Sequence, residues 1–201
     1  SKNRVSSTAT YYGGAVFVNG GLTTLTNATI SDNSIAYAKV GTLFYGGGIY
    51  KNGGKVEVNN SILWNNSRGG GIADQVNLLF TIKNSIVQDG YKTGINVLEG
   101  DPLFVSPATD NYELTACSPA MNTGDNTLST ETEDLASKPR ERTGVVDMGA
   151  YEYQESALII NPAVLPTGNR GVGYNEQLTI EGGTANYTFR ISGGKLPDGL
   201  F

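Results

Sequence analysis

The sequence predicts an all-β protein whose first half is a parallel β-helix, and three observations lead to this. The 201 residues include 27 glycines and nineteen asparagines, the residue types that most readily form tight turns and left-handed backbone. Residues 13–90 repeat a pattern of apolar, small and asparagine positions. No apolar pattern recurs every 3.6 residues over a useful length, so long helices are not expected.

The repeat is visible when three segments are aligned without gaps. They begin at Leu25, Val58 and Ile82, so 33 residues separate the first two and 24 separate the next two. Glycine pairs at 13–14 and 46–47 precede the first two segments with the same spacing of 33. A unit of about 24 residues is too short to bury its own apolar face, so successive units must stack.

The columns of this alignment predict which side chains face the interior. A single strand alternates its side chains with period 2, so it cannot turn inward two positions that lie five apart. The chain must therefore bend between them, at Asn27, Asn60 or Asn84. Asn tolerates left-handed backbone, and stacked Asn side chains can hydrogen-bond along an axis, which predicts a structural Asn ladder. The inward columns are Leu25, Val58 and Ile82, followed by Ile30, Leu63 and Val87, with the small residues Ala28, Ser61 and Ser85 between them.

The next corner repeats turn residues, and it is followed by a longer insertion in the first unit. Asp32-Asn33, Asn65-Asn66 and Asp89-Gly90 occupy this corner. The first interval exceeds the second by nine residues, which predicts a loop within residues 34–45. Aromatic rings on such a loop can stack on a sugar, and the alternative is a flap packed over the neighbouring coil. The candidate ligand-binding residues of this loop are Tyr37, Lys39, Phe44 and Tyr45.

Six short motifs follow the repeat in a fixed order. They are Asp101-Pro102-Leu103-Phe104, Tyr112-Glu113-Leu114, Ser118-Pro119-Ala120, Asp134-Leu135, Pro139-Arg140 and residues 146–153. This order resembles the choice-of-anchor Q region, which follows a right-handed, pectate-lyase-like β-helix in secreted bacterial proteins, often of Bacteroidetes type. The resemblance implies an extracellular or cell-surface location, a role in anchoring or display, and no catalytic residue.

Such a segment has a physical task, because the open strand edges at the end of a β-helix invite aggregation unless they are covered. We expect residues 101–153 to close the last coil and to contain a structural ion pair between Arg140 and Asp147. The apolar groups offered for closing the core are Leu103, Phe104, Leu114, Met148 and Tyr151.

The residue pattern changes again in the last part of the chain. Residues 157–160, 177–180 and 187–191 have the pattern of strands separated by Gly and Asn turns. Residues 182–187 and 196–200 resemble the immunoglobulin-like repeats of bacterial surface proteins, whose sandwich needs about seven strands. We therefore expect β-helix coils in 1–92, a closing segment in 93–154, and the first part of an Ig-like β-sandwich in 155–201.

Composition excludes several functions. The net charge is −5 and no Lys/Arg cluster is present, which argues against nucleic-acid binding. No apolar run approaches the ~20 residues of a membrane-spanning helix. The chain has no histidine and only one cysteine, Cys117, so Ser-His, Cys-His and His-based zinc sites are not available. No catalytic residue and no cofactor are predicted. Calcium is the one ion considered, at Asp32 and Asp89, where Lys83 is the nearest base in sequence, and a stack of turn residues explains that column more simply.

The predicted function is that of a non-catalytic part of a large secreted or cell-surface-displayed protein, adhesin-like or glycan-binding. Its partners would be an extracellular polysaccharide or another surface protein, together with secretion or anchoring machinery. Two alternatives remain open. One is a polysaccharide lyase or hydrolase whose groove lies in coils outside this chain. The other, implied by the resemblance, is the cargo or stalk of a type IX secretion system.

Overall fold

A computed structural model describes residues 3–6, 11–12, 14–36, 44–68, 72–73, 75–76, 79–142, 144–154, 159–169 and 171–181. The chain divides into two compact units, Ser1–Gln154 and Glu155–Phe201. The described residues are nearly all β or irregular, and their only helices are two 3-10 turns, η1 (Pro107–Thr109) and η2 (Asn126–Leu128).

The first unit is built from short strands and two long ones. Its strands are β1 (Arg4–Ser6), β2 (Tyr11–Tyr12), β3 (Val16–Thr26), β4 (Thr29–Ser31), β5 (Ser34–Ala36), β6 (Phe44–Tyr45), β7 (Ile49–Asn59), β8 (Ile62–Trp64), β9 (Ser67–Arg68), β10 (Ile72–Ala73), β11 (Thr81–Val87), β12 (Ile95–Leu98), β13 (Phe104–Ser106) and β14 (Asn111–Leu114).

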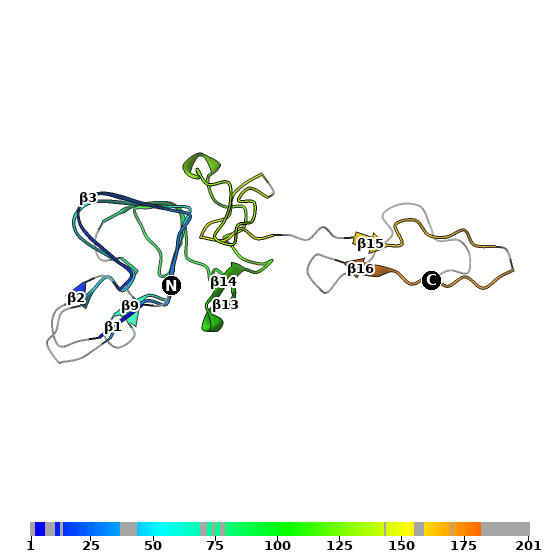
Figure 1. Ribbon diagram of the computed structural model, residues 1–201, viewed down its shortest axis with the longest axis horizontal. Coiled ribbons are helices and arrows are strands. Elements are labelled where there is room, and N and C mark those ends of the chain that lie inside the picture. The colour runs from blue at the N-terminus through cyan, green and yellow to red at the C-terminus, as the bar shows by residue number, and fades with distance from the viewer. Residues whose placement is uncertain are drawn as a thin grey trace. The chain divides into compact units, whose positions relative to one another are not determined.

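A curled parallel sheet forms the body of this unit, with strand order β3-β7-β11-β8-β4. Leu25 pairs with Val58, and Val58 pairs with Ile82. Hydrogen bonds join residues 33 apart and then 24 apart, which is the repeat spacing of the sequence. Figure 1 shows the blue, cyan and green segments of successive repeats lying over one another. The predicted repeat is thus the register of a parallel sheet.

Other sides of the same coils pair in the same way. β1 pairs with β5 and β5 with β9, both in parallel, and β2 pairs in parallel with β6. Among the described strands of this region, only β9 and β10 are antiparallel. The parallel sheet also extends beyond residue 92, because β12 adds to β11 with Lys83 opposite Ile95 and Ser85 opposite Val97.

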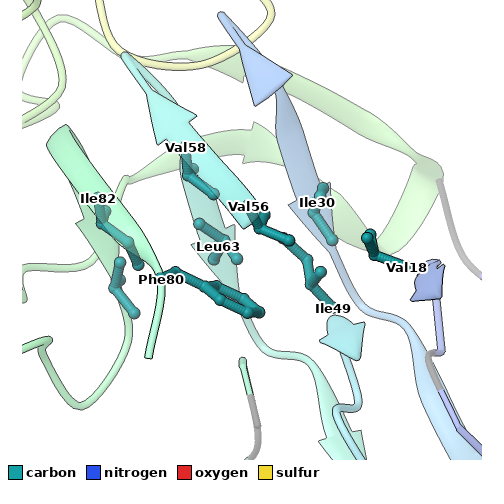
Figure 2. Close-up of a cluster of buried hydrophobic side chains, with 9 residues drawn as sticks. Val18, Ile30, Ile49, Val56, Val58, Leu63, Phe80 and Ile82 are labelled. Atoms are coloured by element: carbon teal, nitrogen blue, oxygen red, sulfur yellow. The ribbon is translucent and has the colours of Figure 1, made fainter. Parts of the chain in front are cut away.

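The interior of the coils is one apolar cluster, shown in Figure 2. The two predicted inward columns meet there, with Leu25 partly buried at its edge. Burying one such side chain contributes about 1.5–3 kcal/mol, so the cluster is a main source of stability. Its buried members are Val18, Ile30, Ile49, Val56, Val58, Leu63, Phe80, Ile82 and Val87.

Two members of the column of small residues, Ser61 and Ser85, bind the backbone through their hydroxyl groups. The Ser61 hydroxyl accepts from the Ala28 amide at 3.1 Å and donates to the Asn59 carbonyl at 2.6 Å. The Ser85 hydroxyl repeats the pattern, accepting from the Ser61 amide and donating to the Lys83 carbonyl. Each serine hydroxyl thus gives the backbone amide that follows the bend a hydrogen-bond partner in the next coil.

The glycine pairs mark a close approach of neighbouring coils. A Cβ placed on Gly14 would lie 1.9 Å from the Gly47 carbonyl oxygen. A substitution at Gly14 would therefore force the two coils apart, which explains why glycine recurs here at the repeat spacing.

The closing segment packs on the outer face of the coils and not over the end of their core. Ile62 and Ile86 flank the inward residues of β8 and β11, so their side chains face outward. Of the five apolar groups expected to close the core, Leu114 and Met148 are buried against these isoleucines and Phe104 packs beside them. Tyr151 is half-buried outside this cluster, and Leu103 is 40% exposed. The reason is that this outward isoleucine pair itself needs covering, and the core contacts after β11 come from Tyr91 and Val97.

In the second unit the described strands are β15 (Ile159–Asn161) and β16 (Thr179–Glu181), which form an antiparallel pair. The expected strand at 187–191 lies outside the described residues. No helix among the described residues is long and apolar enough to cross a membrane.

Candidate functional site

The bend between the two inward columns is formed by left-handed asparagines. Asn27, Asn60 and Asn84 have φ values of 52°, 45° and 45°. Asn96 has φ 51° and donates its side-chain amide to Asn84 Oδ1 at 3.2 Å, so it adds a fourth member to the column. Asn takes this conformation at lower cost than most residues, which is why it repeats at the corner.

Apart from that bond, the hydrogen bonds of these asparagine side chains run to the closing segment. Asn60 Nδ2 donates to the Asp125 carbonyl and Asn60 Oδ1 accepts from the Asp125 amide, both at 2.9 Å. Asn27 Nδ2 donates to the Ser129 hydroxyl at 2.8 Å. The corner column therefore attaches residues 125–129 to the coils.

A continuous amide ladder lies at the next corner, in the buried interior. Asn33 Nδ2 donates to Asn66 Oδ1 at 2.8 Å, and Asn66 Nδ2 donates to Gln75 Oε1 at 2.7 Å. Gln75 continues to Gln88 Oε1 at 3.2 Å, and Asn3 donates to Asn33 Oδ1 at the other end. Asn33 and Asn66 are fully buried. Because buried amides must be paired, this ladder fixes the register of the coils.

A pocket of about 220 Å³ lies where this corner meets the closing segment. The coils contribute Asp32, Trp64 and Asn65 to its lining, and the closing segment contributes Asp101 and Phe104. None of the described residues that line it is Lys or Arg. The pocket therefore combines aromatic surface with hydrogen-bond acceptors and negative charge.

Asp32 is held in place by three neighbours. Its Oδ2 accepts from the hydroxyl groups of Tyr112 at 2.9 Å and Ser31 at 3.0 Å, and its Oδ1 accepts from Asn65 Nδ2. Burial raises the pKa of Tyr112, and the hydrogen bond to Asp32 raises it further, so Tyr112 remains a hydrogen-bond donor at neutral pH. One lone pair of Asp32 Oδ1 is left for a ligand.

The aromatic side of the pocket is also fixed. Trp64 and Phe104 both pack against the outer cluster that holds Ile62 and Met148. Phe104 meets Tyr112 edge to face, with ring centroids 5.3 Å apart and an interplanar angle of 89°. Aromatic residues held in this way present a rigid surface to a ligand.

The predicted site residues do not come together in this pocket. Tyr37 and Lys39 lie outside the described residues, and Phe44 and Tyr45 form β6, of which only the backbone is described. Asp89 is exposed and is not part of the pocket, so Asp32 and Asp89 do not share it.

Metal binding and base chemistry gain no support at these positions. Among the described residues no group of three or more acidic or cysteine side chains is placed to hold a metal. Lys83 is not among the described residues that line the pocket.

The closing segment contains a buried charged cluster around Arg140, which is 1% exposed. Arg140 Nη2 donates to the Gly149 carbonyl, while Nε and Nη1 have no hydrogen-bond partner among the described residues. Burial lowers the pKa of Arg140, and the carboxylates that oppose this are Glu152 first, then Asp134 and Asp147. Asp147 itself accepts from backbone amides, so the cluster joins the last three motifs as a structural unit.

Sequence reasoning did not select Trp64, Asn65, Asp101 or Phe104 as site residues. One signal was present, because Trp64 stands in register with Ser31 in an otherwise polar outward column. An aromatic residue at such a position needs either a cover or a ligand.

Family models, curated proteins and solved structures were all compared with this chain, and none of them matches it.

Proposed function

We propose that this chain is a non-catalytic, glycan-binding part of a secreted or cell-surface-displayed bacterial protein. Residues 1–92, extended by β12, would be coils of a right-handed parallel β-helix, the rest of 93–154 its closing segment, and residues 155–201 the start of an Ig-like module. The parallel register, the left-handed asparagine corners and the inward apolar columns support the β-helix. The handedness, the location and the Ig-like module rest on the resemblance of the sequence.

The pocket between the corner and the closing segment is the observation that carries the binding role. Sugar rings have apolar faces that aromatic side chains contact and hydroxyl groups that carboxylates and amides bind. Trp64 and Phe104 supply the first kind of surface, and Asp32, Asn65 and Asp101 supply the second. A concave site with apolar walls and a few convergent polar groups is the usual form of a small-molecule site.

Catalysis receives less support from the same pocket. Glycoside hydrolysis needs a carboxylic acid whose pKa is raised so that it can protonate the leaving group. Burial raises the pKa of Glu152, but this carboxyl group belongs to the Arg140 cluster and does not line the pocket. Lyase chemistry needs a base, and the described part of the pocket lining contains no Lys or Arg.

A glycan array probed with the labelled chain tests the proposal, together with a cleavage assay on the glycans that bind. We expect retention on a defined set of glycans with no release of reducing or unsaturated ends. Cleavage of a uronate polymer that is lost on changing Asp89 or Lys83 would replace the proposal with the lyase alternative. Absence of binding to any glycan would remove the binding role.

A further inference from the structure

We propose that the pocket takes a single neutral sugar ring and excludes uronic acids, with Trp64 as the stacking surface and Asp32 and Asp101 as hydroxyl acceptors. This inference rests on the proposed glycan-binding function and adds the substrate class and the residues that select it.

Charge decides the substrate class. Two carboxylates, the Asn65 amide and the Ser31 hydroxyl are the polar side-chain groups of the pocket, and none of the described lining residues is cationic. A uronate would place a third negative charge beside Asp32 and Asp101 with no Arg or Lys to pair with it, which is unfavourable in a partly enclosed site. Neutral sugars offer hydroxyl donors, and O–H···O⁻ bonds are short and strong.

The free hydrogen-bonding positions match a donor-rich ligand. Asp101 Oδ1 accepts from the Leu103 amide at 2.8 Å, and Oδ2 has no donor among the described residues. Asp32 Oδ1 has one lone pair left after its bond from Asn65. The pocket therefore presents one acceptor from the coil and one from the closing segment, both already oriented by the protein. Preorganised acceptors lower the entropy cost of binding.

The size of the pocket limits the ligand to one ring. Its volume of about 220 Å³ lies below the ~300–1,000 Å³ that drug-sized ligands occupy. A longer glycan would place one residue in the pocket and extend along the surface. We expect affinity for a monosaccharide in the millimolar range, with gains from multivalent display.

Trp64 makes the test direct, because it is the only tryptophan in the chain. Its fluorescence is titrated in the full 201-residue chain with methyl glycosides of galactose, glucose and mannose, and with galacturonate at neutral pH. We expect a saturable change with at least one neutral glycoside and at least tenfold weaker binding of galacturonate. A response to galacturonate as strong as that to every neutral sugar would overturn the inference.

Two matched variants locate the binding. Asp101→Asn keeps the Oδ1 acceptor of the turn but removes a charged acceptor, whereas Asp89→Asn makes the same change outside the pocket at a left-handed position that Asn accepts. Asp101→Asn should lower the affinity for the neutral sugar about tenfold, as the loss of one charged hydrogen bond predicts. The same variant should reduce the difference in affinity between the neutral sugar and galacturonate. Asp89→Asn should leave both affinities unchanged. Equal effects of the two variants would contradict the assignment.

The remaining outcomes separate this inference from the function on which it rests. Array binding with an unchanged Trp64 signal would keep the glycan-binding function and overturn the pocket as its site. Titration with calcium alone, and with sugar in EDTA, checks for an ion: a sugar response that disappears in EDTA would show a metal-bridged ligand and overturn direct binding by the carboxylates.

Discussion

Asn60 and Asp125 pair as two strand residues would, although one partner is a side chain. The Asn60 side chain donates through Nδ2 to the Asp125 carbonyl and accepts at Oδ1 from the Asp125 backbone amide, both at 2.9 Å. Asn60 is fully buried. The same residue carries the left-handed bend of its coil, with φ 45°. One side chain therefore both turns the chain and attaches the closing segment.

Asn60→Ala should lower the free energy of unfolding by about 2–4 kcal/mol. The loss combines two hydrogen bonds at roughly 0.5–1.5 kcal/mol each with the cost of about 1 kcal/mol for a left-handed alanine. Asn60→Gly separates the two effects, because it restores the backbone freedom without the side chain and should recover about 1 kcal/mol. Urea unfolding followed by Trp64 fluorescence measures both. A cost below 0.5 kcal/mol for Asn60→Ala would contradict the attachment role.

Leu63→Asp should be among the most damaging changes in the first unit. Leu63 is 0% exposed within the core cluster, and an aspartate there has no partner for its charge. We expect a loss above about 4 kcal/mol, or failure to fold. Leu79→Asp is the control, because Leu79 is 72% exposed and the same change there should cost less than about 0.5 kcal/mol. Similar unfolding midpoints for the two variants would contradict the inward assignment of the column.

The sequence predicted those parts of the fold that follow from local periodicity. The odd spacing between Leu25 and Ile30 requires a bend, and the structure has a left-handed Asn27 at that place. The pocket could not be found in the same way, because Trp64 and Asp101 belong to different segments. No one-dimensional pattern states which outer face of the coils the closing segment covers. The buried amide ladder was also missed, since Asn33 and Asn66 have the pattern of ordinary turn residues.

The stability of the first unit should fall as the pH rises from about 4.5 to about 7. Burial raises the pKa of Glu152 to about 7, whereas an unfolded glutamate titrates near ~4.3. Between these two pKa values the folded state binds more protons than the unfolded state. The stabilisation from protonated Glu152 is therefore complete below its pKa in the unfolded chain, and it is lost as the pH rises through its pKa in the folded chain. The expected loss is about 2 kcal/mol, allowing for solvent screening.

A matched variant isolates this titration. The chain contains no histidine, so no side chain has an unperturbed pKa between 5 and 8, and only the terminal amine titrates in the same range as Glu152. Glu152→Gln keeps an acceptor for the Asp147 amide, which Glu152 binds at 2.9 Å. Its urea midpoint should be flat between pH 5 and 7 and higher than that of the unmodified chain at pH 8. A wild-type profile that is flat over the same range would contradict the assignment.

Limited proteolysis should cut first at Glu155, because the chain divides into compact units between Gln154 and Glu155. A glutamate-specific protease also meets Glu131, Glu133 and Glu141, which are exposed. Their backbone is nevertheless tied down, since Arg140 N donates to the Thr132 carbonyl at 2.9 Å and Asp134 N to the Lys138 carbonyl at 2.8 Å. Cleavage requires local opening, which is costly where backbone hydrogen bonds hold a segment.

Mass spectrometry of the early fragments should therefore find a product ending at Glu155 that resists further cutting. In Glu155→Gln this early product should disappear, while the slower cuts keep their rates. If cleavage falls first within residues 101–150 while the part after residue 155 resists, the closing segment does not belong to the coil unit. The hydrogen bonds of Asn27 and Asn60 to residues 125–129 would then not persist in solution, and the pocket beside Trp64 would lose its second wall.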